Sequence, residues 1–161
     1  MAVQSVTAKD VPIHFAYGSI KDADAQYSGA ESSWSGMTVR RAQFRGGGEY
    51  ALFEVVRFAG NYGTVHRSVS SSVGQLINKE RKVSWGSSGE VMGGAFPTEY
   101  QTFLMTDRKA TCLGVQRVLS IYEDTGSGTY AQAMLYGFYC RPGESPIPSD
   151  EARTIAGAVH T

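Results

Sequence analysis

The chain has 161 residues, and its 15 basic and 15 acidic side chains cancel to zero net charge. A chain of this length buries most of its apolar surface in one core, so we predict a single domain over residues 1–161, with residues 1–37 partly irregular. Zero net charge gives no electrostatic case for a nucleic acid or an anionic membrane as partner. No run of about 18 apolar residues occurs, so no transmembrane segment is predicted.

The first 37 residues show few regular patterns. Residues 11–15 read Val-Pro-Ile-His-Phe, which predicts a short edge strand because Pro12 has no N–H for a central ladder. Residues 19–36 are polar and include Ser-Ser-Trp-Ser-Gly, so we predict a loop there.

A clearer β-hairpin follows. The segments MTVRRAQFR and EYALFEVVRFAG flank three glycines at positions 46–48, which predicts a three-residue hairpin loop. If the two strands pair symmetrically about Gly47, Arg45 faces Glu49 and Arg40 faces Glu54. Both would be stabilising cross-strand pairs of opposite charge.

After residue 67 the hydrophobic period changes from that of a strand to that of a helix. We predict a helix of about twelve residues with Ser68 as its N-cap, because one apolar stripe is formed by Val69, Val73, Leu76 and Ile77. Two strands are predicted next, one over residues 82–85 with 90–92 and one over residues 99–106.

Residues 108–141 predict a long β-hairpin with a cysteine near each end. Two segments rich in β-branched and aromatic residues flank the turn formers at 123–128. When Tyr122 faces Tyr130, Cys112 falls opposite Cys140, at the Cα separation of about 4.5–5.5 Å that a disulfide accepts. We predict a disulfide between Cys112 and Cys140, and two reduced, half-buried cysteines are the alternative.

A final helix is predicted from an N-cap at Ser149. Asp150 and Glu151 suit its positive end, and the apolar stripe consists of Ala152, Ile155, Ala156 and Val159. Together the patterns predict an α+β fold, a mostly antiparallel sheet of five to seven strands with two helices packed on it.

The ending TCLGVQR…YGFYCRPGESPIPSDEARTIAGAV resembles the C-terminal portion of small exported bacterial proteins of unassigned function. In those proteins a cysteine pair brackets a hairpin before a short helix. The resemblance covers about the last 50 residues. It implies a periplasmic or surface location and no particular activity.

Few residues suggest chemistry. The DTGS sequence at 124–127 matches the aspartic-protease signature, but Tyr122 and Glu123 precede it where that motif has apolar residues, and turn composition explains it. His14, His66 and His160 lack metal-ligand spacing, and two cysteines give too few ligands for structural zinc, so no metal is predicted. No phosphate-binding loop is present, so no cofactor is predicted either.

Two binding features are predicted, each with a plain structural alternative. His66 and Arg67 precede the first helix, where they could hold an anion, and an ordinary loop is the alternative. Trp34 and Trp85 could line a binding surface, and core packing is the alternative.

We therefore predict an exported, periplasmic or secreted, non-enzymatic domain that binds a small ligand or a protein partner, although no signal peptide is recognisable in the sequence. The alternatives are a hydrolase whose site is assembled from scattered residues and a cytoplasmic interaction module with reduced cysteines. Self-association through exposed edge strands fits each hypothesis.

Overall fold

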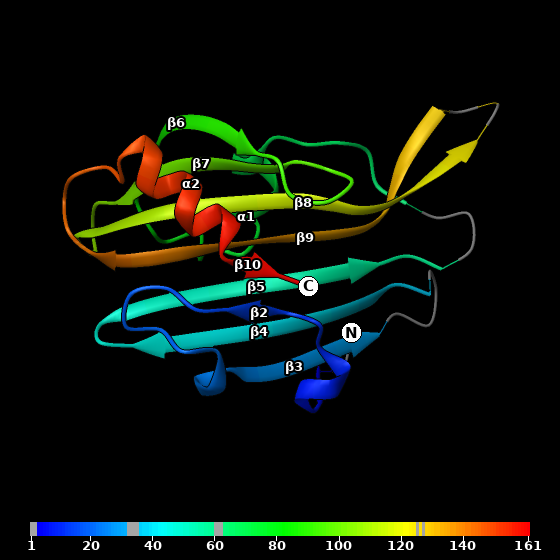
Figure 1. Cartoon of the computed structure of the whole chain (residues 1–161), viewed down its shortest axis with the longest axis horizontal. Helices are drawn as coiled ribbons and strands as arrows, with labels where there is room; N and C mark the ends of the chain where they lie inside the picture. The colour runs from blue at the N-terminus through cyan, green and yellow to red at the C-terminus, as the bar shows by residue number, and fades with distance from the viewer. Residues whose placement is uncertain (1–2, 32–35, 60–62, 125, 127) are drawn as a thin grey trace.

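The protein is described by a computed structural model that covers residues 3–31, 36–59, 63–124, 126 and 128–161. Its main sheet has eight strands in the order β1-β3-β4-β5-β9-β8-β7-β6, and every neighbouring pair is antiparallel (Figure 1). A second, two-stranded sheet pairs β2 with β10. The strands of the main sheet are β1 (Val3–Ser5), β3 (Gln26–Glu31), β4 (Thr38–Gly46), β5 (Glu49–Arg57), β6 (Val83–Val91), β7 (Thr98–Met105), β8 (Ala110–Asp124) and β9 (Gly128–Pro142).

The remaining elements lie on this sheet. They are β2 (His14–Phe15), β10 (Val159–His160), the helices α1 (Val69–Gly74) and α2 (Ser149–Gly157), and two short 3₁₀ turns, η1 (Ala8–Asp10) and η2 (Asp22–Asp24). The predicted fold class, a mostly antiparallel sheet carrying two helices, is confirmed. Among the described helices, none is long and apolar enough to cross a membrane.

The two faces of the sheet carry different cores. On the α2 face, α2 and the N-terminal segment lie over the sheet (Figure 1). The core on this face includes Phe44, Phe53 and Leu135. On the opposite side, which we call the α1 face, Val69 and Val73 of α1 pack over Leu52, Phe103, Phe138 and the cysteine pair. Because side chains alternate along each strand, neighbouring residues of one strand serve different cores.

The central hairpin, β8 with β9, has the predicted register. Cys112 lies opposite Cys140 and Tyr122 opposite Tyr130, and a bulge between Val118 and Ile121 separates the two regions. The cysteines form the predicted disulfide, with their Cα atoms 4.1 Å apart. The ends of β8 and β9 nearest their turn extend beyond the rest of the sheet (Figure 1). The DTGS sequence at 124–127 falls partly outside the described residues.

The register predicted for β4 and β5 is wrong by one residue. Only Gly47 and Gly48 form the turn, with φ of 55° and 81°, while Gly46 belongs to β4 and pairs with Glu49. Two residues with positive φ give the primed turn whose twist matches that of a hairpin. Glu54 consequently faces Arg41 and not Arg40.

Several predicted boundaries also change. Strand β3 occupies six residues of the segment predicted as a loop, because pairing with β4 along its whole length overrides the weak local signal. Helix α1 has six residues, not about twelve, and ends at Gly74, although Ile77 beyond it is still buried. Helix α2 begins one residue early, with Pro148 as N-cap, and Val159 lies in β10 and not in the helix. Strand β6 runs without a break through residues 86–89, with a bulge after Trp85.

Candidate binding site

A line of polar side chains crosses the α1 face at right angles to the strands. Its members are successive cross-strand partners on β4, β5, β9, β8 and β7, and we call them the polar row: Arg41, Glu54, Tyr136, Gln116 and Glu99. A directly opposed residue on each neighbouring strand shares the same face, so the five side chains lie side by side. Arg41 belongs to the row because the first hairpin has the register described above.

Glu54 is a buried member of the polar row. Its side chain is 6% exposed, and its Oε1 accepts hydrogen bonds from Arg41 Nε at 2.8 Å and from Arg41 Nη2. Its Oε2 accepts a hydrogen bond from the Tyr136 hydroxyl at 3.0 Å. A buried carboxylate needs such partners because it has lost its hydration.

The Tyr136 phenol is held in its protonated form. Burial, followed by the neighbouring Glu54 carboxylate, raises the pKa of Tyr136 above its ordinary value. The hydroxyl therefore donates to Glu54 at neutral pH. Its donor is committed to the protein, and only its lone pairs are left for other groups.

A cavity of about 500 Å³ opens beside Arg41, Glu54 and Tyr136. This volume lies within the range of small-molecule sites, about 300–1,000 Å³. The strands β3, β4, β5 and β9 contribute to the cavity, together with the segment that leads into α1. Its lining residues are Ala30, Met37, Val39, Arg41, Glu54, Val56, Phe58, Thr64, Val65, Arg67, Ser72, Gln75, Met134 and Tyr136.

The polarity of the cavity changes along the strands. The next row on the α1 face, two residues beyond the polar row, consists of the paired side chains of Val39, Val56 and Met134. Phe58 and Met37 continue this apolar end. The polar end lies toward α1, which contributes Ser72. The cavity therefore has an apolar part and a charged part in a fixed order.

The structure brings His66 and Arg67 to this region. Arg67 lines the cavity, and His66 Nε2 lies 2.9 Å from Glu99 Oε2 at the end of the polar row. Gln116, which is fully buried, donates from Nε2 to the Arg67 carbonyl and to Glu99 Oε2, and so fixes this segment on the sheet. Within the described residues, Gln116 Oε1 has no hydrogen-bond partner.

The segment of His66 and Arg67 leads into a short, capped helix. The Ser68 hydroxyl accepts a hydrogen bond from Ser71 N, as predicted for an N-cap, and the helix has only six residues. Trp85 is half-buried and lies against Phe103, with ring centroids 4.6 Å apart, so it belongs to the core of the α1 face. Trp34 lies outside the described residues.

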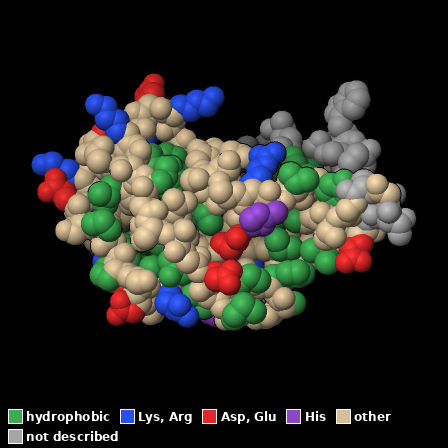
Figure 2. All heavy atoms as spheres, turned by 90° about the horizontal axis from the view of Figure 1, so that it is seen from above, with side chains coloured by type: hydrophobic (Ala, Val, Ile, Leu, Met, Phe, Trp, Pro, Cys, Tyr) green, Lys and Arg blue, Asp and Glu red, His purple; other side chains and the backbone are tan. Residues whose placement is uncertain are grey.

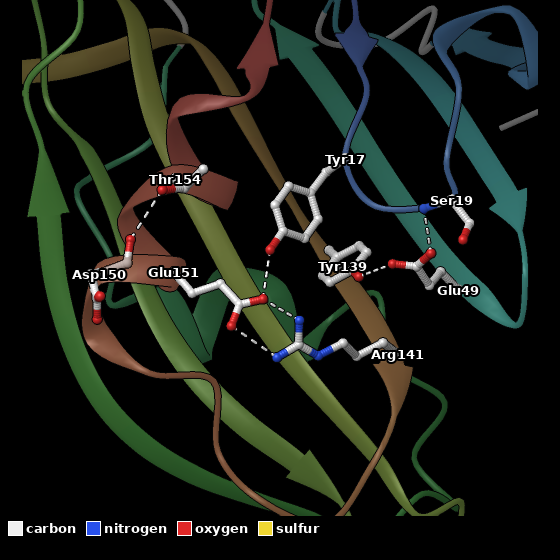
Figure 3. Close-up of polar contacts among 8 residues, drawn as sticks. All are labelled: Tyr17, Ser19, Glu49, Tyr139, Arg141, Asp150, Glu151 and Thr154. Atoms are coloured by element: carbon white, nitrogen blue, oxygen red, sulfur yellow. Dashed lines mark hydrogen bonds and ion pairs between the residues drawn. The ribbon is translucent and has the colours of Figure 1, made fainter.

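A second polar cluster lies on the α2 face and fastens the N-terminal segment and α2 to the sheet (Figure 3). Glu151 Oε1 accepts hydrogen bonds from Tyr17 at 2.6 Å and from Arg141 Nη1, and Arg141 Nη2 donates to Oε2 at 3.1 Å. Glu49 accepts hydrogen bonds from the Tyr139 hydroxyl and from the backbone N–H of Ser19. Arg141 and Glu151 are paired with each other, and Glu49 is held by Tyr139 and Ser19, which indicates a structural role.

The pairing of β2 with β10 brings two distant histidines together, which sequence spacing did not predict. His160 lies opposite His14, and His14 Nδ1 is 3.1 Å from Asp22 Oδ2. Both histidines and Asp22 line a shallow cavity of about 280 Å³. No group of three or more histidine, cysteine, aspartate or glutamate side chains among the described residues is arranged to hold a metal ion.

A search of protein-family models, curated proteins and solved structures found no match to this chain. The function therefore has to be inferred from the site.

The carboxylate of the cavity is committed to hydrogen bonds within the protein. The polar side chains of the described cavity lining are one carboxylate, two guanidinium groups, one phenol, one amide and the hydroxyls of Thr64 and Ser72. The carboxylate is engaged by Arg41 and Tyr136, so it is poorly placed to act as a general base toward Ser72.

On the face shown in Figure 2, positive and negative side chains are interspersed and form no extended field of one sign.

Proposed function

We propose that this protein is an exported, non-enzymatic domain that binds a small ligand in the cavity on the α1 face. The observation that carries the proposal is the cavity of about 500 Å³, in which an apolar end is joined to a fixed group of charged side chains. Concave, mainly apolar surfaces with a few convergent polar groups are the usual form of small-molecule sites.

The extracytoplasmic location is supported by the disulfide between Cys112 and Cys140, both of which are buried. Disulfides persist in oxidising compartments and are rare where thiols are kept reduced. A free-thiol count and fractionation of source cells test this part. Oxidised protein in the periplasmic or secreted fraction supports it, and two free thiols in cytoplasmic protein would refute it.

Ligand binding is tested with the neutral dye N-phenyl-1-naphthylamine, whose fluorescence rises when it enters an apolar site. Val39 lines the cavity and is half-buried, so Val39→Phe should fill part of the apolar end and weaken dye binding by about tenfold. The matched control is Thr38→Phe, since the neighbouring residue of the same strand points to the other face.

Dye binding that is weakened by Val39→Phe but not by Thr38→Phe supports the proposal. Absence of binding, or equal effects of the two substitutions, would contradict it. A panel of generic ester, peptide and glycoside substrates separates the alternative of a hydrolase, because turnover of any of them would favour that alternative.

A further inference from the structure

The charge balance of the cavity sets the sign of the ligand. The described lining includes two arginines, Arg41 and Arg67, and one carboxylate, Glu54, so it has one excess positive charge. A cationic ligand would meet this excess, whereas an anionic group would neutralise it.

Arg67 supplies the unpaired charge. Its guanidinium forms no ion pair or side-chain hydrogen bond with any described residue, although its backbone carbonyl is held by Gln116. It lies close enough to the polar row for its positive charge to oppose the rise in the pKa of Tyr136. A planar guanidinium with free donors beside a cavity suits a carboxylate or a similar oxyanion.

Arg41 adds a second donor at the same end. Its Nε and Nη2 are both directed to Glu54 Oε1, and Nη1 forms no hydrogen bond with a described residue. Glu54 fixes the Arg41 side chain, and the Tyr136 hydroxyl in turn holds Glu54, so little conformational freedom is lost when Nη1 binds a ligand. Both donors belong to the charged part of the cavity, while Val39, Val56 and Met134 form the apolar part.

We infer that the ligand is an amphipathic monoanion, with its acidic group toward Arg67 and Arg41 and its apolar body on Val39, Val56 and Met134. This inference rests on the proposed function, because it names the chemical class that the same cavity takes. The order of charged and apolar rows along the strands also fixes the direction in which the ligand lies.

The test uses two dyes that share the same N-phenylnaphthylamine ring system. The anion 1-anilinonaphthalene-8-sulfonate differs from neutral N-phenyl-1-naphthylamine by its sulfonate group. For each protein we would measure both affinities by fluorescence titration and take their ratio, so that differences in the apolar contacts cancel. Arg67→Gln should lower the anion-to-neutral ratio by about tenfold, since it removes a charge-assisted contact and keeps a polar side chain.

Arg57→Gln is the matched control. Arg57 is exposed and lies on the same sheet, but its position in β5 points it to the opposite face. The control removes the same net charge and should leave the ratio unchanged. Arg67→Lys, which keeps the charge, should restore part of the ratio, and added salt should weaken binding of the anionic dye only.

The outcomes separate the two proposals. If Val39→Phe weakens binding of the neutral dye but Arg67→Gln leaves the anion-to-neutral ratio unchanged, ligand binding in the cavity is supported and the inferred anionic ligand is refuted. If Arg67→Gln and Arg57→Gln lower the ratio equally, the change reflects the net charge of the protein and not a contact at Arg67, and the inference also fails. If neither dye binds, the proposed function itself fails and the inference fails with it.

Discussion

Removing the disulfide should reduce the stability of the folded chain by an amount that can be calculated from its position. Cys112 and Cys140 are separated by 28 residues, and the bridge closes this loop in the unfolded state. The chain-entropy relation for a loop of this length gives about 3.6 kcal/mol at 25 °C. In urea, with a slope of about 2 kcal/mol per M, the unfolding midpoint should fall by about 1.8 M.

The measurement compares three forms of the protein by equilibrium unfolding in urea. Reduced wild type keeps both sulfur atoms in the core, so its loss reports the crosslink alone. The double variant Cys112→Ala with Cys140→Ala also loses the sulfur contacts, and both positions are buried, so it should unfold at a still lower urea concentration. Both forms should have a steeper slope than the oxidised protein, because their unfolded states are less compact.

A loss of less than about 1 kcal/mol on reduction would refute the loop-closure reasoning. It would mean that the unfolded chain already keeps the two ends of the hairpin close together without the bridge. A large loss in the alanine variant with little loss on reduction would assign the effect to core packing and not to the crosslink.

Two further predictions concern backbone packing and pH. A Cβ at Gly137 would lie 2.1 Å from the Leu52 carbonyl oxygen, so Gly137→Ala should destabilise the protein by about 2–3 kcal/mol in urea unfolding. Gly74→Ala is the control, because nothing lies within 4 Å of a Cβ at Gly74, and this substitution should stabilise α1 by about 0.4–1 kcal/mol. Equal losses of stability in the two variants would contradict the steric explanation. The hydrogen bonds of Glu151 with Arg141, and then with Tyr17, hold the pKa of Glu151 below its ordinary value. The ion pair therefore stabilises the fold above about pH 4.5. Its contribution disappears as the pH falls through the lower pKa of the folded state. Thermal unfolding should therefore show Glu151→Gln less stable than wild type by about 1 kcal/mol at pH 7. This difference should shrink as the pH falls below about 4.5, and a difference that does not change with pH would refute the assignment.

The central hairpin could be predicted from the sequence because its information is local. Two long strands of high β-propensity meet at a turn rich in glycine, and only one symmetric pairing places Cys112 opposite Cys140. The first hairpin lacks such a marker. Three consecutive glycines accept a turn centred on either of two positions, and a slip of one residue moves Arg41 to the other face.

The cavity could not be predicted because it depends on strand order. Glu54 meets Tyr136 only because β5 lies next to β9, and nothing local in either segment specifies that neighbour. Arg67, which precedes a helix in the sequence, does line the cavity. The sequence signal for this residue is its positive charge before the helix. Residue type alone indicates Trp85 as a candidate for a binding surface, whereas in the structure it lies in the core of the α1 face.

The place of β9 in the sheet has a consequence for the order of folding. Strand β9 lies between β5 and β8, so the four strands β1, β3, β4 and β5 have no paired contact with β6 and β7 except through the central hairpin. During synthesis, β5 is complete long before residues 128–142 leave the ribosome, and its outer edge stays unpaired until they do. Contacts so distant in sequence form slowly. The chain therefore remains incompletely folded until its last third is available, and during that time β5 is open to pairing with another chain.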